Sequence, residues 1–263
     1  MPEGDTVRQT AVALTRELGG ATLRRAQLRH PRLATADLTG RTVEGARSVG
    51  KHLFLRFGGD LSLHSHLGMD GSWTFHDPGR RAPVGHWTRV LLQTDTRLAL
   101  GQRLLRLALV PTGEESGLVA HLGPDLLDPD WSPEMAELAR RRLTADPDRE
   151  LGLALLDQHV MAGVGNVYKT EVCFLLGVSP WTPVSGVDPV ETVELCRKLL
   201  VDNADRRQRS TTGQPGRGRE LWVYGRDRLG CLRCGGPVLT GVQGSGTRER
   251  IAYHCPRCQP GPA

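Results

Sequence analysis

The chain has 263 residues, 38% of them hydrophobic, and a formal net charge of +5 at pH 7. This length can form more than one buried core, and we expect two domains and a small module. No apolar run is long enough to span a membrane and the N-terminus lacks a signal pattern, so we expect a cytoplasmic protein without a membrane partner. The positive charge favours a polyanionic partner.

The cationic residues are nearly all arginine. Of the 34 lysines and arginines, only Lys51, Lys169 and Lys198 are lysines. Arginine keeps its charge in proteins, whereas lysine can lose its proton and act as a base. Each of the three lysines is therefore a candidate for proton transfer.

The first seven residues carry a candidate nucleophile. Removal of Met1 would leave Pro2 as a free secondary amine, which attacks a sugar or carbonyl carbon to give a charged iminium. Glu3 would then give or take the proton that such a step requires. Asp5 or Thr6 is expected to cap a helix whose positive end keeps the amine unprotonated. The alternative is a solvated terminus without a chemical role.

A β-rich domain is expected over residues 1–120. Short apolar or alternating runs are separated by Gly, Asp and Pro, which is typical of a β-sandwich or barrel. The expected strands are Ala21–Leu28, Arg41–Val49, His52–Phe57, Leu61–Leu67, Trp87–Thr94, Arg97–Leu100 and Leu104–Val110, with another beginning near Trp73.

Two turns of this domain carry candidate site residues. Lys51 follows a glycine; beside Pro2 its cation would lower the pKa of the amine, and the alternative is a solvated surface lysine. Met69 lies at the tip of a Gly-bounded turn, where a flexible apolar side chain either wedges between bases or fills a core. His64 and His66 share a strand face and are expected to be structural, because no third metal ligand is apparent.

Residues 121–131 contain two prolines and three aspartates and are expected to be a linker. A helical domain is predicted over residues 132–220. Its helices are expected at residues 132–143, 151–160 and 166–176, and after a cap at Asp188.

The turn Gly163-Val164-Gly165-Asn166 is a candidate phosphate site. Its glycines let backbone approach an anion, the following helix supplies free N–H groups, and Asn166 adds a side-chain donor. The turn lacks the length and the lysine of a nucleotide P-loop, so we expect a polymer backbone and no nucleotide cofactor. A plain helix hairpin is the alternative. The Arg- and Gly-rich loop 206–219 either contacts phosphate or is disordered.

The segment 221–263 is expected to be a zinc finger. Its four cysteines form two pairs separated by twenty residues: Cys231, Cys234, Cys255 and Cys258. Four thiolates leave zinc no open position, so the expected cofactor is one structural zinc ion, with disulfides or free thiols as alternatives. A predicted hairpin, Pro237–Val242 with Glu249–His254, carries Arg248 and Arg250, which contact DNA or form a solvated face. The other two cysteines are expected to be buried fillers.

Taken in order, these motifs resemble the formamidopyrimidine-DNA glycosylase and endonuclease VIII family over nearly the whole chain. They are Pro2-Glu3, Lys51, His66-Leu67-Gly68-Met69, Leu122-Gly123-Pro124, Gly163-Val164-Gly165-Asn166, Val223-Tyr224-Gly225-Arg226 and Cys255-Pro256-Arg257-Cys258-Gln259 with its partner pair. The resemblance implies an α+β multidomain fold: an N-terminal β-sandwich with a terminal helix, a helix–two-turn–helix domain and a C-terminal zinc-ribbon hairpin.

The beginning Met1-Pro2-Glu3-Gly4 and the short segment 212–221 resemble the endonuclease VIII branch. The sequence as a whole looks most similar to the second form of that branch in actinobacteria. Residues Leu104–Val110 lack the arginine–phenylalanine wedge of the guanine-lesion branch. Two positions depart from the family pattern: Thr6 replaces a common Glu, and Leu67-Gly68-Met69 replaces a Gln-Leu-Tyr wedge. These departures bear on the lesion range and leave the core chemistry unchanged.

The resemblance implies a bifunctional DNA glycosylase and abasic-site lyase that acts on damaged DNA as a monomer and favours oxidised pyrimidines. Pro2 would attack the sugar of a flipped nucleotide, Glu3 would protonate that sugar, and Lys51 would act in β-elimination. Arg250 would bind phosphate and act in the second elimination. Asn166, with Gly165, would bind phosphate, and Met69 would fill the space left by the flipped base.

Three alternatives remain open. A DNA-binding protein of the same fold with weak or no glycosylase activity would keep the ribbon and Asn166 but leave Pro2 idle. A glycosylase for formamidopyrimidine or 8-oxoguanine would share the chemistry and differ in lesion. A tautomerase that uses Pro2 as a base would explain neither the ribbon nor the basic loop.

Overall fold

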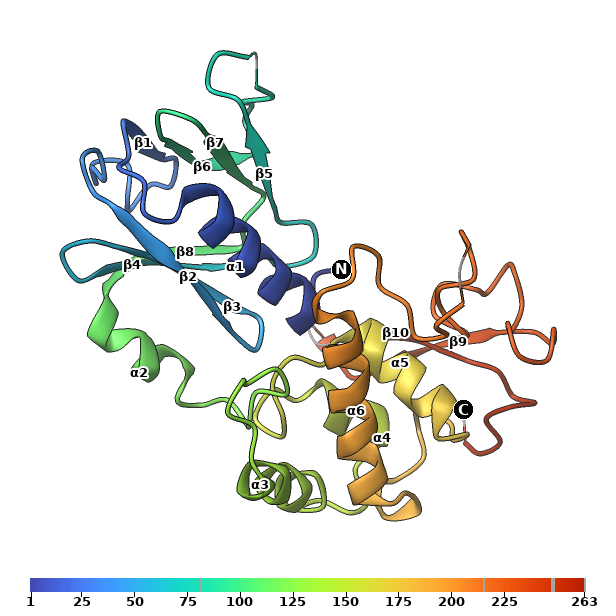
Figure 1. Cartoon of the computed structure of the whole chain (residues 1–263). Coiled ribbons are helices and arrows are strands. Elements are labelled where there is room, and N and C mark those ends of the chain that lie inside the picture. Colours follow the sequence, from blue (N-terminus) through green and yellow to red (C-terminus); the bar gives the residue numbers. More distant parts are fainter. Residues whose placement is uncertain (81, 215, 247–248, 263) are drawn as a thin grey trace. The chain divides into compact units, whose positions relative to one another are not determined.

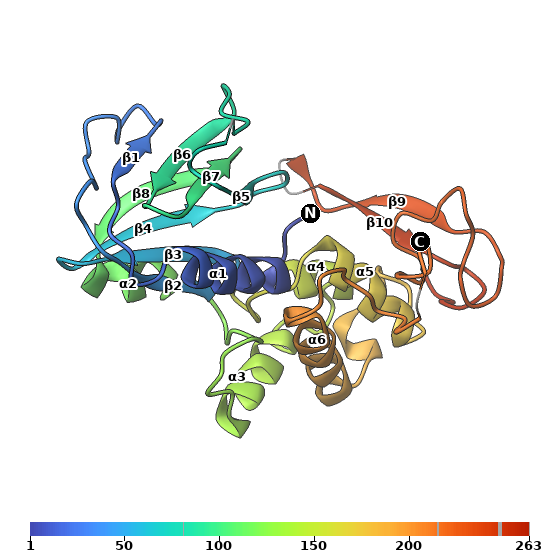
Figure 2. The same cartoon turned by 45° about the horizontal axis from the view of Figure 1, so that its top comes forward.

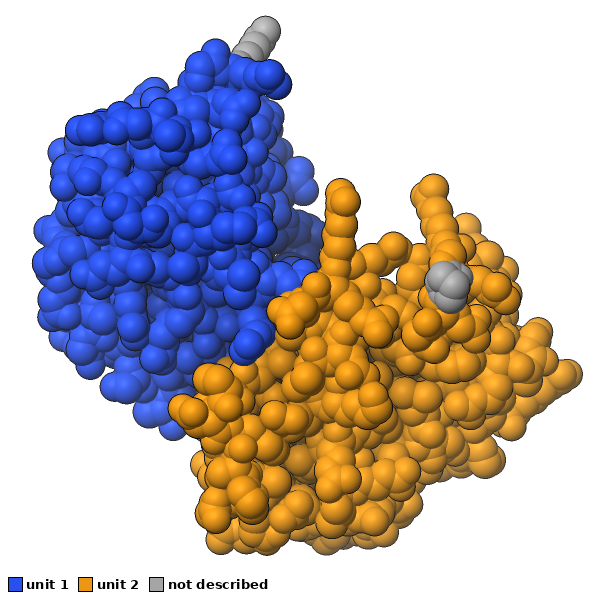
Figure 3. Space-filling view, in the orientation of Figure 1, with its two compact units in different colours: residues 1–121 blue, residues 122–263 orange. Residues whose placement is uncertain are grey.

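The computed structural model describes residues 1–80, 82–214, 216–246 and 249–262. The chain divides into two compact units, residues 1–121 and residues 122–263 (Figure 3). Among the described residues, none of the helices combines the length and the hydropathy needed to cross a bilayer.

Unit 1, residues 1–121, consists mainly of a long N-terminal helix and two four-stranded antiparallel sheets (Figures 1 and 2). The helix is α1 (Gly4–Leu18), and the strands are β1 (Arg25–Leu28), β2 (Val43–Val49), β3 (His52–Phe57), β4 (Leu61–His66), β5 (Ser72–His76), β6 (Thr88–Gln93), β7 (Leu98–Gln102) and β8 (Arg106–Pro111). One sheet has the order β1-β6-β7-β5 and the other β2-β3-β4-β8. The predicted β-sandwich with its terminal helix is confirmed.

The core of unit 1 lies between the two sheets and under α1. The helix buries Val7, Leu14 and Leu18, which recur at helical spacing, against strand residues such as Phe57 and Val90. Burial of these apolar side chains against the strands fixes the direction of α1 over the sandwich.

The helix begins earlier than its sequence suggests. Glu3 is the N-cap residue, in place of the expected Asp5 or Thr6, and its carbonyl accepts the Val7 N–H at 3.0 Å. Asp5 is buried within the first turn, where its carboxylate accepts from the Thr6 hydroxyl. The expected cap residue was wrong because tertiary burial of the first turn outweighs local capping preference.

A short helical segment closes unit 1: the 3-10 turn η1 (Thr112–Glu114) and α2 (Glu115–Val119). Glu115 is buried and accepts hydrogen bonds from Arg56 and Ser62. Burial alone would raise the pKa of Glu115, but these hydrogen bonds outweigh it and the pKa is lowered. Helix α2 was not predicted from the sequence, since its five residues are too few to show a helical period.

Unit 2, residues 122–263, contains helices followed by a hairpin. The helices are α3 (Pro133–Leu143), α4 (Leu151–Leu156), α5 (Asn166–Leu175) and α6 (Pro189–Ala204), with the 3-10 turn η2 (Val184–Gly186) before α6; the hairpin strands are β9 (Leu239–Gln243) and β10 (Arg250–His254). Ser132 and Asp188 cap α3 and α6 with their side chains, as predicted. α4 ends four residues earlier than expected.

Residues 122–131, expected to be a linker, pack against the helices of unit 2. Leu126 and Leu127 are buried in the helical core, and the Leu126 N–H donates to the Ala162 carbonyl at 3.2 Å. Gly123 also donates its N–H to the Gln158 carbonyl. The finer division of the chain at residues 131 and 220 stays a prediction.

Candidate functional site

The beginning of α1 and the β2–β3 turn lie at the same end of unit 1. Helix α1 and strand β2 run in opposite directions. The residues after α1 contact the first residue of β2, and the Ala46 N–H donates to the Thr15 hydroxyl at 2.8 Å. From Thr15 back to Glu3 the helix covers about 18 Å. From Ala46 to Val49, where β2 ends, the strand covers about 10 Å in the same direction, and the turn that carries Lys51 follows. Glu3 and Lys51 therefore lie toward the same end of the sandwich.

Glu3 is fully buried although it is acidic. Its backbone is extended, with φ −125° and ψ −172°, and turns into α1 at the next residue. Burying a carboxyl group costs free energy unless neighbouring groups form hydrogen bonds or ion pairs with it. A buried carboxyl group of this kind is therefore a candidate for a functional site. Pro2 directly precedes Glu3, the N-cap residue, so both residues lie at the positive end of α1.

The β4–β5 turn lies at the end of the sandwich where α1 begins (Figures 1 and 2). Met69 in this turn is 56% exposed, which excludes the core-filler alternative. His66 Nδ1 accepts the Gly68 N–H at 3.0 Å, so in the neutral imidazole the proton is on Nε2. The His66 carbonyl accepts the Leu105 N–H at 2.9 Å and joins this turn to the β7–β8 connection.

Three histidines lie close together on the adjacent strands β3 and β4: His52 on β3, and His64 and His66 on β4. His52 Nδ1 and His64 Nε2 are 2.9 Å apart, and the two rings are parallel within 2°, so the rings share an N–H···N hydrogen bond. Burial, with smaller contributions from neighbouring charges, lowers the pKa of His52 and of His66 to about 4 and lowers that of His64. All three imidazoles are therefore neutral at pH 7. This agrees with the expectation that His64 and His66 are structural.

Acid should destabilise the protein through these imidazoles. The unfolded chain takes up protons as the pH falls below the ordinary histidine pKa of 6.5, whereas folded His52 and His66 do so only near pKa 4. The free energy of unfolding should thus be retained above pH 6.5 and fall as the pH drops toward 4. Urea titrations at about pH 7, 6 and 5 measure this fall. The fall should be shallower in His52→Gln and unchanged in His86→Gln, which removes an exposed imidazole; equal slopes in His52→Gln and the wild type would contradict the assignment.

In unit 2, the first residue of α5 contacts strand β10. Asn166 donates from Nδ2 to the Ile251 carbonyl at 2.9 Å, and its buried Oδ1 has no hydrogen-bond partner in the described part of the chain. Arg250 directly precedes Ile251, so the structure brings Gly165, Asn166 and Arg250 together. Gly163 has φ 113°, a conformation that other residues rarely adopt, and this allows the chain to turn into α5. Arg248 lies outside the described residues.

Glu171 on α5 holds the segment that leads to the hairpin. Its carboxylate accepts the backbone N–H groups of Trp222, Val223 and Tyr224 at 2.8, 3.0 and 2.9 Å, and the Thr211 hydroxyl. Burial raises the pKa of this carboxyl group, and the four donors oppose that effect. No local pattern in the sequence marks Glu171, because its partners lie 40 to 53 residues away in the chain.

The structure assigns different environments to the three lysines. Lys198 is exposed and pairs with Asp202 at 2.6 Å, one helical turn away. Lys169 is fully buried in α5 and its Nζ lies 3.3 Å from Gln243 Oε1, which ties α5 to β9. Lys51 alone lies in a turn at the end of unit 1 where α1 begins.

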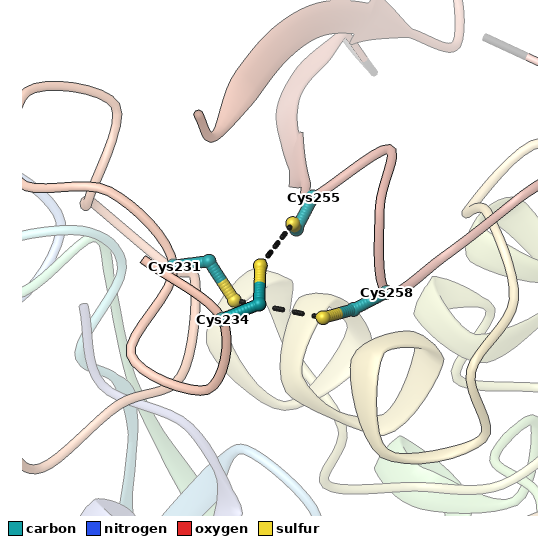
Figure 4. Close-up of side chains that lie close together, drawn as sticks. All are labelled: Cys231, Cys234, Cys255 and Cys258. Atoms are coloured by element: carbon teal, nitrogen blue, oxygen red, sulfur yellow. Dashed lines mark hydrogen bonds between the residues drawn. The ribbon is translucent and has the colours of Figure 1, made fainter. Parts of the chain in front are cut away.

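Four cysteine side chains point toward one another at the base of the hairpin (Figure 4). Their Sγ atoms all lie within 4.8 Å of each other, with Cys234 and Cys255 at 3.5 Å and Cys231 and Cys258 at 3.9 Å. Disulfide sulfurs lie about 2.05 Å apart, which excludes both pairings. Tetrahedral zinc at about 2.3 Å from each sulfur would hold them about 3.8 Å apart. The donor set thus fits one tetrahedral metal ion.

The four-cysteine cluster is supported by the rest of unit 2. The Gly236 N–H donates to Cys234 Sγ at 3.4 Å, and this backbone hydrogen bond is the main reason why the pKa of Cys234 is lowered to about 7. Gln259 accepts the Cys255 N–H and donates to the Val178 carbonyl. Arg233 lies over the ring of Phe174 at 4.3 Å. Among the described residues, these cysteines form the one group of metal-ligand type.

Comparisons with known proteins agree over the full chain. The model of the formamidopyrimidine-DNA glycosylase N-terminal domain matches residues 1–107, and the model of that family's H2TH domain matches residues 122–203. The chain belongs to the formamidopyrimidine-DNA glycosylase family. The first match covers the β-sandwich and the second covers α3 to α6, so the predicted family and fold are confirmed.

Within this family, the similar proteins include endonucleases 8. A probable endonuclease 8 2 of Streptomyces coelicolor is 53% identical over 100% of this chain and 95% of its own length. The DNA-(apurinic or apyrimidinic site) lyase Nei2 of Mycolicibacterium smegmatis is 48% identical over 98% of this chain and 99% of its own. The fold matches Lactococcus lactis formamidopyrimidine-DNA glycosylase, solved with abasic-site DNA, with a TM-score of 0.81 at 22% identity, covering 99% and 100% of the two chains.

Proposed function

We propose that this chain is a bifunctional DNA glycosylase and abasic-site lyase of base excision repair, which releases oxidised bases through a Schiff base on Pro2. The observation that carries the proposal is the fully buried Glu3 directly behind Pro2, with Lys51 toward the same end of the sandwich. Family membership and the relative named as an abasic-site lyase support damaged DNA as the substrate.

The chemistry starts from Pro2 once Met1 has been removed. The Pro2 nitrogen attacks C1′ of the damaged nucleotide, Glu3 protonates the opening sugar, and the base leaves. A secondary amine has one proton to lose, so the resulting iminium is charged. The iminium draws electrons from C2′. Loss of a proton from C2′ then expels the 3′ phosphate. Lys51 moves this proton, and Arg250 assists a second elimination that expels the 5′ phosphate.

Residues of both units bind the DNA in this proposal. Gly165, Asn166 and Arg250 hold backbone phosphate, and Met69 fills the space that the flipped base leaves. One zinc ion on the four cysteines holds the hairpin in shape and takes no part in the reaction. The protein acts as a monomer without a nucleotide cofactor.

Oxidised pyrimidines are the favoured lesions. The two relatives described above are named as an endonuclease 8 and an abasic-site lyase, and both are similar over nearly their whole length. A second candidate is a guanine-lesion glycosylase, which the formamidopyrimidine family model favours. Duplexes with thymine glycol, dihydrouracil, 8-oxoguanine or a plain abasic site distinguish these substrates. A fastest reaction with 8-oxoguanine would overturn the pyrimidine preference.

The reaction class is tested by borohydride reduction of the protein with abasic-site DNA. An iminium on Pro2 becomes a stable amine, and the N-terminal peptide then carries the mass of the sugar. A DNA-binding protein without catalysis would bind the same duplex and give no such adduct. Activity on a small keto acid without DNA would favour the tautomerase alternative.

Glu3→Gln should separate the two activities. Base release should fall by about 100-fold or more, because the amide cannot donate the proton that a general acid supplies. Cleavage at a preformed abasic site should fall much less, since no base has to leave. The control is Glu44→Gln, an exposed carboxylate on β2. Single-turnover rates on a lesion duplex and on an abasic duplex give the comparison; equal losses would refute the role of Glu3 in base release.

A further inference from the structure

A buried glutamine at the end of strand β9 joins three parts of unit 2. The side chain of Gln243 is almost wholly shielded from solvent. Lys169 Nζ of α5 donates to its Oε1 at 3.3 Å. Its Nε2 donates to the carboxylate of Glu150, the residue before α4, at 2.8 Å and to the Pro180 carbonyl at 2.8 Å. The proposed chemistry uses none of these groups.

The partners of Gln243 fix which way its amide points. A lysine amine, which donates, faces the amide oxygen, whereas a carboxylate and a carbonyl, which accept, face the amide nitrogen. Turning the amide over would place acceptor against acceptor and break all three hydrogen bonds. Space is also limited, because a Cβ atom on Gly152 of α4 would overlap Gln243 Oε1. The side chain is therefore held in one position.

Gln243 is the cross-strand partner of Arg250, the first residue of β10. Side chains of directly opposed residues project from the same face of an antiparallel pair. The next pair, Val242 and Ile251, lies on the opposite face, and both of its side chains are exposed. Arg250 thus leaves the hairpin on the face that packs on α5. On the same side, the Ile251 carbonyl accepts Asn166 Nδ2 at 2.9 Å.

We propose that Gln243 is a positioning residue for Arg250. Its amide, held by Lys169 and Glu150, fixes the end of β9 against the helices. The strand pairing passes this position on to Arg250, which stays beside Asn166. An arginine that acts on one phosphate needs such support, because a displacement of about 1 Å can slow a reaction about 100-fold. This inference rests on the proposed function for the second elimination, the step that Arg250 assists.

The test compares the two eliminations on a duplex with a preformed abasic site. Gln243→Met keeps the length of the side chain and removes its hydrogen-bonding groups. The ratio of second to first elimination should fall about tenfold, within the loss that a misplaced group causes, while the rate of the first elimination is retained. In NMR spectra of the protein without DNA, the Asn166 side-chain amide signal should move toward that of a solvent-exposed amide. Gln27→Ala, which changes a half-buried glutamine on β1, should alter neither readout.

An exchange of amide and carboxylate provides a rescue. Gln243→Glu alone places two carboxylates together and should also lower the ratio. Gln243→Glu combined with Glu150→Gln again sets a donor against an acceptor at position 150 and keeps an acceptor for Lys169. The double variant should recover part of the ratio, since the Pro180 carbonyl still lacks its donor. A double variant no better than Gln243→Glu would contradict the proposed hydrogen-bond order.

The remaining outcomes are distinct. An unchanged ratio and an unchanged Asn166 signal in Gln243→Met would overturn the inference. Equal loss of both eliminations, or loss of zinc, would assign Gln243 to the stability of the hairpin and would also overturn it. Borohydride trapping of the wild-type protein is measured separately. A wild type that gives no trapped adduct would refute the proposed reaction, whereas the Asn166 signal would still decide whether Gln243 holds the hairpin in place.

Discussion

Pro2→Gly should reduce borohydride trapping on abasic-site DNA by about 100-fold or more, the largest effect that we expect from any single substitution. Glycine supplies a primary amine at the same place, so the variant keeps a weak ability to form an imine. It loses the secondary amine that gives a charged iminium directly, and it loses the ring that fixes the nitrogen in front of Glu3.

The trapping experiment needs a control for reaction at other amines. Lys198→Ala removes an exposed primary amine of α6 and should trap at the wild-type rate. Affinity for a duplex with an uncleavable abasic-site analogue should be retained in Pro2→Gly, because a one-residue change before α1 leaves the proposed phosphate-binding residues in place. Mass spectrometry of the trapped peptide decides the case: an adduct on Lys51 or on a retained Met1 would show that Pro2 is not the nucleophile.

Elements that depend on local sequence were predicted well. The spacing of apolar residues in α1, the caps Ser132 and Asp188, and the two cysteine pairs are local patterns, and the structure confirms each of them. The strand order of the two sheets was not predicted, because pairing such as β1 with β6 joins residues far apart in the chain. The fold class followed from the strand rhythm and the family resemblance together.

The candidate site residues also divide into those that local sequence predicts and those whose environment depends on distant parts of the chain. Pro2, Glu3 and Lys51 stood out by residue type and position, yet the burial of Glu3 follows only from the packing of α1 on the sheet. Glu171 had no recognisable signal, since a glutamate on an apolar helix receives its hydrogen bonds from a distant segment. Trp87 was taken as the first residue of a strand, whereas the structure leaves it exposed before β6.

Removal of the metal should abolish DNA binding by the hairpin while unit 1 stays folded. Zinc binding to four thiolates contributes about 10 kcal/mol or more to small zinc domains. The apolar cluster beneath the hairpin is small, with Phe174, Val223 and Val238 as its main members apart from two of the cysteines. Without the ion, four thiols would have to remain packed together with little else to hold them. Duplex affinity should therefore fall at least about tenfold when the protein is stripped with a chelator.

Cys234→Ala should reproduce the loss, whereas Cys173→Ala should not, because Cys173 is buried in the helical core away from the cluster. Metal content measured by atomic emission should be one zinc per chain in the wild type and in Cys173→Ala. Hydrogen exchange should rise in β9 and β10 of the stripped protein and stay low in the sandwich strands, since unit 1 has its own core. Duplex affinity that survives complete stripping would show that the hairpin holds its shape, and binds DNA, without a metal.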